Sequence, residues 1–248
     1  MRVIVTRAAA QAASWVGALQ QAGLRAQALP LIGIQAAPDP AAVRASWARL
    51  PGLAMVIFVS ANAVQHFFAA RPAGATWPAG LVAGSTGPGT SAALRSAGVL
   101  QIEEPAADAA EFDSEALWAR LRARAWHGRR VLVVRGEAGR DWLARRLREQ
   151  SAEVDFISAY RRVPPVLDEP ARLLLAAAMV APARYLWLFS SSEAVSHLSR
   201  LAPRFDWSAS WAWASHERIA QAARAAGFAR VERFVPDPLW VAQRLRPD

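Results

Sequence analysis

The chain has 248 residues, of which 54% are apolar and 20% charged, a composition that supports a buried core in one large domain or two smaller ones. It has no cysteine, and all 29 basic residues are arginine, which excludes disulfides, thiolate metal sites, a cysteine nucleophile, Schiff-base lysines and a P-loop lysine. The net charge of +9 favours an anionic partner, either a nucleic acid or a small polyanion.

The first segment, residues 2–7, reads as a β-strand and not as a signal peptide. The longest apolar stretch, residues 173–181, is far shorter than the roughly 20 residues that a membrane helix needs. We therefore expect a cytoplasmic protein with no membrane partner.

Further along the chain, short apolar runs alternate with alanine-rich helical stretches, which predicts βα units and a parallel sheet. Three segments recur in the same order about 130 residues later, which indicates two similar halves. The matched pairs are residues 2–7 with 130–136, 55–67 with 185–198, and 81–99 with 210–228.

Proline clusters follow equivalent strands in the two halves, at Pro38 and Pro40 and again at Pro164, Pro165 and Pro170. A simple duplication would place the domain boundary near residue 126. If both clusters instead mark crossings between domains, residues 37–165 form an inserted α/β domain, and residues 1–36 and 166–248 form a discontinuous one. Such a two-stranded connection predicts an active site in the cleft between the domains.

Two turns between a strand and a helix carry hydroxyl groups. Ser60 and Asn62 follow the strand at residues 55–59, and Ser190, Ser191 and Ser192 follow its counterpart. These side chains either cap the helices or, with the free N–H groups of the turn, bind an anion such as a carboxylate. Ser190 lacks the surroundings of a nucleophile.

A third turn, from Gly84 to Ser91, is rich in glycine and nearly matches a P-loop, but Thr90 stands where the lysine is required. It also matches a dinucleotide-binding pattern, with Glu103 or Glu104 as a loose candidate for the ribose contact. Such a pattern normally follows the first strand of a domain, whereas this one is internal, so a plain tight turn competes with the nucleotide-binding interpretation.

A fourth turn places Ser215 as the expected helix cap, with the helix beginning at His216, which either caps the helix or donates to an anion. The histidines show no metal-binding spacing. Arg135 and Gly136 end another strand, with Arg140 one turn later, and both arginines are candidate carboxylate ligands.

Tyr160 precedes the second crossing and is flanked by Arg161 and Arg162. A phenol keeps its proton at neutral pH, so this residue is a candidate acid or hydrogen-bond donor. The alternative is a tyrosine that only packs at a hinge near the surface.

Taken together, these motifs resemble uroporphyrinogen-III synthases. The shared features are VTR near the start, LP before the first crossing, F-x-S-x-N-A-V at residues 58–64, G-P-x-T at residues 87–90, a strand ending in R-G, and A-Y-R before the prolines. The resemblance covers nearly the whole chain and implies two α/β domains, each a parallel sheet flanked by helices.

The resemblance also implies an enzyme that closes hydroxymethylbilane, a linear tetrapyrrole polycarboxylate, to uroporphyrinogen III. Ring D is inverted, water is lost and no cofactor or metal takes part. It places the family's tyrosine at Tyr160, its helix-start threonine at Thr90, its serine turns at Ser60 and at Ser190 to Ser192, and the end of the first strand at Thr6 and Arg7. Glu217 departs from the family's pattern at the fourth turn, where a carboxylate would repel an anion.

Two other functions compete with this interpretation. One is a phosphate- or nucleotide-binding receptor without catalysis, which would use the glycine-rich turn. The other is a nucleic-acid binder, but Trp15, Trp118 and Trp142 lie in amphipathic segments where core packing explains them better. We expect a monomer that binds a small molecule and no nucleic acid.

Overall fold

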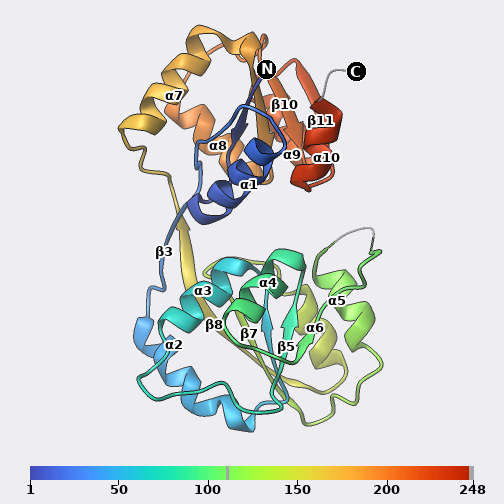
Figure 1. Ribbon diagram of the computed structural model, residues 1–248. Helices are drawn as coiled ribbons and strands as arrows, with labels where there is room; N and C mark the ends of the chain where they lie inside the picture. The colour runs from blue at the N-terminus through green and yellow to red at the C-terminus, as the bar shows by residue number, and fades with distance from the viewer. Residues whose placement is uncertain (110–111, 246–248) are drawn as a thin grey trace. The chain divides into compact units, whose positions relative to one another are not determined.

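The computed structural model describes residues 1–109 and 112–245 (Figure 1). The chain divides into two compact units, which are described separately below: unit 1 comprises Met1–Gly33 and Val163–Asp248, and unit 2 comprises Ile34–Arg162. The expected boundaries after residues 36 and 165 lie three residues further along the chain. Within the described ranges, every helix is too short or too polar to cross a membrane.

Unit 1 contains the two ends of the chain, drawn in dark blue and in orange to red in Figure 1. Its elements are β1 (Arg2–Val5), α1 (Ala9–Gln21), β2 (Ala26–Ala28), α7 (Glu169–Val180), η2 (Pro182–Arg184), β9 (Tyr185–Phe189), α8 (Ser192–Leu201), β10 (Trp211–Ala214), α9 (Glu217–Ala225), β11 (Arg230–Arg233) and α10 (Pro238–Leu245). The strands form one sheet in the order β11-β10-β9-β1-β2, all parallel. The assignment of residues 1–36 and 166–248 to one domain predicts that the first strand joins the sheet of residues 185–189, and the register of Arg2 with Tyr185 confirms this pairing.

Unit 2 is the central block of the chain. Its elements are β3 (Gly33–Ala36), α2 (Pro40–Ser46), η1 (Trp47–Gly52), β4 (Met55–Phe58), α3 (Ala61–Ala69), β5 (Val82–Ser85), α4 (Pro88–Ser96), β6 (Ile102–Glu103), α5 (Ser114–Leu121), β7 (Arg130–Gly136), α6 (Trp142–Glu149) and β8 (Glu153–Val163). Its sheet has the order β3-β8-β7-β4-β5-β6.

The two sheets place matched segments in the same order. The segments paired by sequence occupy equivalent strands: β1 of unit 1 matches β7 of unit 2, β9 matches β4, and β10 matches β5. The order β2-β1-β9-β10-β11 in unit 1 therefore corresponds to β8-β7-β4-β5-β6 in unit 2. In each unit the strand order reverses between the first two matched strands, β1 and β9 or β7 and β4. Open α/β sheets bind ligands beyond the carboxyl ends of the strands at such a point.

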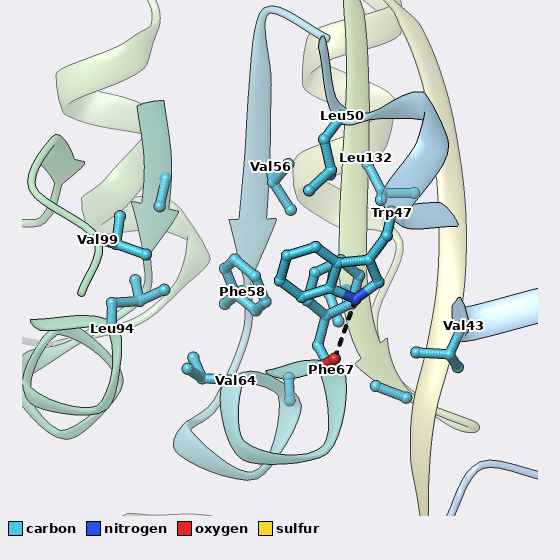
Figure 2. Close-up of a cluster of buried hydrophobic side chains, with 14 of the residues drawn as sticks. Val43, Trp47, Leu50, Val56, Phe58, Val64, Phe67, Leu94, Val99 and Leu132 are labelled. Carbon is cyan, nitrogen blue, oxygen red and sulfur yellow. Dashed lines mark hydrogen bonds between the residues drawn. The ribbon is translucent and has the colours of Figure 1, made fainter. Parts of the chain in front are cut away.

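Helices cover both faces of each sheet, so the central strands are buried on both sides. In unit 2, Val56 and Phe58 of β4 pack with Trp47, Val64 and Phe67 on the face covered by α2, η1, α3 and α4 (Figure 2). The Trp47 indole stacks on Phe67 and donates to its carbonyl oxygen at 3.2 Å. The alternate residues Met55 and Ile57 pack against α5 and α6 on the other face.

In unit 1, Leu186 and Leu188 of β9 face α1 and α10. Trp187 and Phe189 point to the opposite face, where they form an aromatic cluster with Trp207 and Phe228. Trp15, Trp118 and Trp142 all pack against these cores, as the sequence pattern predicted. Burial of large rings on both faces gives each unit its own core.

The predicted crossings contain prolines for a different reason from the one expected. Pro40 and Pro170 stand in the first turns of α2 and α7, where the absence of an N–H group is tolerated, and Asp39 and Asp168 cap these helices. The chain passes between the units just before each cluster, in β3 and β8, which are neighbours in the sheet. Pro40 and Pro170 therefore belong to helices that begin just after the crossings.

Gly33 lies where the chain enters β3. A Cβ atom added to it would come within 2.7 Å of Val163 Cγ2 and 3.0 Å of the Pro164 carbonyl oxygen. The segment before it is tied to α8, because His197 Nδ1 lies 2.6 Å from the Leu31 carbonyl oxygen. Glycine is needed here because the two strands of the connection approach closely.

We expect Gly33→Ala to lower the free energy of unfolding by about 1–3 kcal/mol, because backbone atoms must move to admit the methyl group. The measurement is the midpoint of urea unfolding. The control is Gly17→Ala in α1, where an added Cβ meets nothing within 4 Å and should be neutral or stabilising. Equal midpoints for Gly33→Ala and the parent would show that the neighbouring Val163 and Pro164 can move to admit the methyl group without loss of stability.

Candidate functional site

The unit 2 candidate site lies at the reversal of strand order between β4 and β7. Ser60 follows β4 and caps α3, accepting a hydrogen bond from the Ala63 amide at 3.1 Å. Its Oγ lies 3.1 Å from the Tyr160 hydroxyl. Two positions that are 100 residues apart in the sequence are thus joined by one hydrogen bond.

Tyr160 is buried, with 3% of its surface exposed, and packs in the same core as Phe58 and Ala63. The expectation of a hinge tyrosine near the surface was therefore wrong. The reason is a bulge in the pairing of β7 and β8: Arg135 lies opposite Ser158, whereas Gly136 lies opposite Tyr160. The extra residue shifts the register and turns the tyrosine into the core.

Gly136 makes room for the phenol ring. An added Cβ would come within 3.0 Å of Tyr160 Cζ and 3.3 Å of its hydroxyl oxygen. The glycine at the end of this strand therefore serves close packing against Tyr160.

We expect Gly136→Ala to displace the Tyr160 ring from Ser60 and lower the turnover of the reaction proposed below by about 10-fold or more, since misplaced groups lose that much. Gly139→Ala is the matched control, because its added Cβ would meet only Arg135, at an ordinary 3.8 Å. The rates of both variants and the parent are compared under saturating substrate. Full activity in Gly136→Ala would mean that the ring position is not critical.

His66 also contacts the tyrosine. It lies in α3, one turn beyond Asn62 on the same helix face, and its ring stacks on Tyr160 with 5.9 Å between centroids and 24° between planes. Burial lowers the pKa of His66 below its ordinary value. Asn62 itself is buried in the first turn of α3.

In unit 1, the corresponding reversal of strand order holds Thr6 and Arg7. Thr6 is fully buried and donates to the Leu188 carbonyl oxygen at 2.7 Å, so its hydroxyl is used to join β1 to β9. Arg7 is half-buried, and its guanidinium lies 4.4 Å from the centre of the Trp15 ring. Within the described ranges it has no hydrogen-bond or ion-pair partner.

Burial lowers the pKa of Arg7 to about 10, so it remains charged at neutral pH. A partly desolvated cation without a carboxylate partner is costly to a protein unless it serves an anionic ligand. Arg7 is therefore the strongest candidate for an anion ligand in unit 1.

The serine turn follows β9, the strand next to β1. Ser191 caps α8 and accepts from the Glu193 amide at 3.1 Å. The Ser192 hydroxyl is buried and has no hydrogen-bond partner in the part of the chain that the structure describes. Ser190 is half-buried. This turn thus combines a helix N-terminus with a buried hydroxyl that no described group satisfies.

The fourth turn differs from its prediction. The cap of α9 is His216 and not Ser215: His216 has an extended backbone, its Nδ1 accepts from the Arg218 amide at 3.2 Å, and the helix begins at Glu217. An imidazole nitrogen with a free lone pair caps a helix as a serine oxygen does. Glu217 forms an ion pair with Arg224 at 3.0 Å, which offsets its negative charge at the turn.

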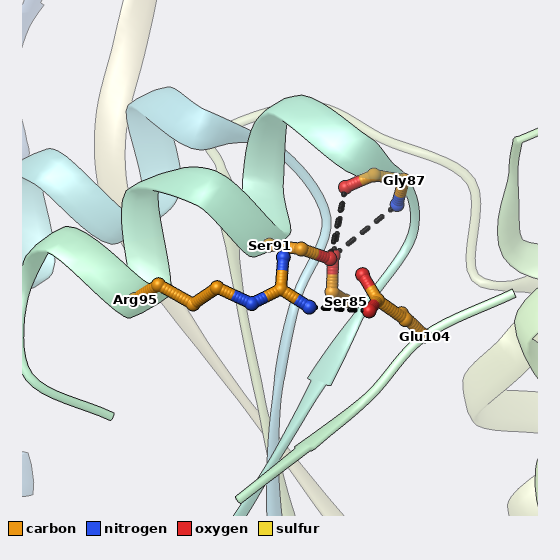
Figure 3. A network of polar contacts seen from close by, with 5 residues as sticks. All are labelled: Ser85, Gly87, Ser91, Arg95 and Glu104. Carbon is orange, nitrogen blue, oxygen red and sulfur yellow. Dashed lines mark hydrogen bonds and ion pairs between the residues drawn. The ribbon is translucent and has the colours of Figure 1, made fainter. Parts of the chain in front are cut away.

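The glycine-rich turn is occupied by its own side chains (Figure 3). The Ser85 hydroxyl accepts from the Gly87 amide at 3.3 Å and from the Ser91 hydroxyl at 2.8 Å. Glu104 pairs with Arg95, and hydrogen bonding from Ser91, reinforced by Arg95, lowers the pKa of Glu104. The amide that would cradle a phosphate is thus already engaged.

Of two residues predicted for this turn, one lies elsewhere and the other lies at the predicted helix start. Gly84 is a buried strand residue of β5, where an added Cβ would come within 3.0 Å of Ile57, so it packs in the core and is not at a ligand-binding turn. Thr90 is the third residue of α4, which begins at Pro88, and is 5% exposed.

The two candidate arginines at the end of β7 and after it, Arg135 and Arg140, bind carboxylates of the chain itself. Arg135 forms an ion pair with Asp141 and lies over the Phe156 ring at 4.1 Å, while its Nε is buried without a partner among the described residues. Arg140 is exposed and pairs with Glu115 at 3.0 Å. The described residues contain no group of three or more acidic or histidine side chains placed to hold a metal ion.

Comparison with known proteins gives the family. The family model described as "Uroporphyrinogen-III synthase HemD" matches residues 13–237. The chain belongs to the uroporphyrinogen-III synthase family. Two solved structures have a similar fold at 16% identity. A mutant uroporphyrinogen III synthase from the extremely thermophilic bacterium Thermus thermophilus is matched over 98% of this chain and 96% of that one, with a TM-score of 0.57. The uroporphyrinogen-III synthetase from Helicobacter pylori 26695 is matched over 99% and 100%, with a TM-score of 0.60.

For this uroporphyrinogen-III synthase family member, the structure brings together some predicted residues and separates others. Ser60, Gly136 and Tyr160 meet at one point of unit 2. His66 was missed, although its spacing of four residues from Asn62 places both on one face of α3. The hydrogen bond of Ser91 to Ser85 and the ion pair of Glu104 with Arg95 at the glycine-rich turn were not foreseen, because contacts between side chains depend on the fold.

Proposed function

We propose that this protein closes hydroxymethylbilane to uroporphyrinogen III, with inversion of ring D and loss of water, in tetrapyrrole biosynthesis. The single observation that carries this proposal within the fold is the hydrogen bond between Tyr160 and Ser60 at the strand-order reversal of unit 2. Family membership and the anion-binding features of both units support it.

The proposed substrate is a polycarboxylate, and the strand-end turns supply suitable donors. Arg7 offers a forked cation, and the Ser192 hydroxyl lacks an internal partner in the described part of the chain. The N-termini of α3 and α8 add N–H groups and a positive dipole. We propose that these groups bind carboxylates, while Arg135 and Arg140 act in ion pairs that stabilise unit 2.

The chemical step requires departure of the hydroxyl group of the bilane as water. A serine hydroxyl has one donor and two acceptor sites, and Ser60 already accepts from the Ala63 amide. Ser60 can therefore donate to the phenol oxygen, which leaves the phenol proton available and stabilises the phenolate that remains after transfer. Tyr160 is nearly fully buried, whereas Ser60 is half-buried, so a substrate would reach the pair from the side of Ser60.

Once water has left, the pyrroles stabilise the resulting cation, and ring closure returns a proton, so the net change is the loss of one water. The competing spontaneous closure occurs without inversion. The main task of the protein is then to hold the bilane in the arrangement that gives the type III product.

The decisive experiment supplies the purified protein with enzymatically generated hydroxymethylbilane and separates the type I and type III products. The expected result is type III product in excess of the type I product formed without protein. Type I product alone, in the same amount as without protein, would contradict the proposal.

A nucleotide receptor is the second candidate, and the glycine-rich turn argues against it. A phosphate would have to displace the Ser85 hydroxyl from the Gly87 amide, and both Glu103 and Glu104 are engaged by arginines. Calorimetry with ATP and NAD should detect no micromolar binding. We further propose a cytoplasmic monomer, for which size-exclusion chromatography with light scattering tests the oligomeric state.

A further inference from the structure

His66 contacts the Tyr160 ring of the proposed Tyr160–Ser60 pair, and the proposed chemistry leaves it without a role. It is half-buried in α3, and its imidazole stacks on the phenol ring of Tyr160. No described residue forms a hydrogen bond or an ion pair with the His66 side chain. The imidazole therefore contributes to this region through its ring.

Besides the apolar core, three neighbours of different kinds contact the Tyr160 ring. Its hydroxyl is bonded to Ser60, and Gly136 lies so close to the end of the ring that carries the hydroxyl that an added Cβ would come within 3.0 Å of Cζ. Both contacts are at that end, so neither supports the face of the ring. The flat imidazole of His66, at 24° to the phenol plane, packs against this face and opposes a tilt of the ring that would carry the hydroxyl away from Ser60.

We infer that His66 is a positioning residue: it holds the Tyr160 ring so that the phenol stays within hydrogen-bond distance of Ser60 during catalysis. This inference rests on the proposed function. A flat aromatic ring is what the position requires, and neither the charge nor the proton of the imidazole takes part.

Two substitutions separate the shape of the ring from its chemistry. His66→Leu keeps the apolar volume but removes the flat face, and we expect kcat for type III formation to fall about 3- to 10-fold, with KM within about twofold. His66→Phe restores a flat ring, and kcat should return to within about twofold of the parent. Gln65→Ala, the exposed neighbour in α3, and His127→Ala, an exposed histidine elsewhere in unit 2, are controls that should leave both constants unchanged.

A double substitution tests whether His66 acts through Tyr160. In the Tyr160→Phe background, which lacks the hydroxyl to be positioned, His66→Leu should cause no further loss of kcat. Losses that multiply would overturn the inference, as would full activity of His66→Leu. A His66→Phe variant as slow as His66→Leu would also overturn it, because the imidazole itself would then be required.

A spectroscopic measurement tests the contact without catalysis. The chain has two tyrosines, so ring-labelled tyrosine gives two sets of NMR signals, which Tyr160→Phe assigns. In His66→Leu, the Tyr160 signals should shift while those of Tyr185 stay in place. An unchanged Tyr160 signal in His66→Leu would overturn the inference, whatever the activity of the parent. Failure of the proposed function would give a different result: the parent would form no type III product, but the Tyr160 signals would still shift in His66→Leu.

Discussion

Tyr160→Phe is expected to lower the rate of type III formation by about 10-fold or more, because general acid assistance typically contributes between about 10²- and 10⁴-fold. The substitution removes one hydroxyl, which lies 3.1 Å from Ser60 Oγ, and keeps the ring that packs in the unit 2 core. The type I product should accumulate, since released bilane closes spontaneously. The measurement is the rate and ratio of the two products with enzymatically generated substrate.

The stability of this variant separates chemistry from packing. Loss of the hydrogen bond to Ser60 should reduce the free energy of unfolding by about 1 kcal/mol, too little to unfold the protein. Ser60→Ala and Thr90→Ala should each slow the reaction less, because backbone donors remain at those turns. If Tyr160→Phe were as fast as the parent, the tyrosine would have only a packing role, and positioning alone would account for catalysis.

Arg7→Gln is expected to raise KM for the bilane by about 10- to 100-fold, since a hydrogen bond to a charged group is worth about 1.5–3 kcal/mol. The Arg7 guanidinium is partly buried against Trp15, and no described residue pairs with it, so a carboxylate ligand would be its first ionic partner. Arg7→Lys should have an intermediate effect, because it keeps the charge but loses the forked geometry.

The matched control is Arg25→Gln, which makes the same change in net charge at an exposed position of unit 1. It should leave KM nearly unchanged. Raising the salt concentration should increase KM of the parent more than that of Arg7→Gln, because salt screens the interaction that the variant has lost. Equal salt dependence in both proteins would argue against a contact between Arg7 and the substrate.

Local patterns in the sequence determined much of the architecture. Buried parallel strands must be continuous apolar runs, so residues 55–58 and 185–189 were visible as strands without a structure. Turns between strands and helices need capping groups, which identified Ser60 and the serine turn. The proline clusters at equivalent places in the two halves predicted that the first strand joins the sheet of residues 185–189, which the register confirms.

Contacts between distant segments were decided only by the tertiary structure. A single bulge between β7 and β8 placed Tyr160 inside the core, and no local pattern encodes the register of two strands at that resolution. The pairing of Arg135 with Asp141, and the absence of such a partner for Arg7 among the described residues, depend on which side chains the fold brings within reach. The sequence by itself thus determined the strands, the turns and the family resemblance. The fold decided which polar groups satisfy one another and which are left for a ligand, because hydrogen bonding and desolvation depend on distances in space.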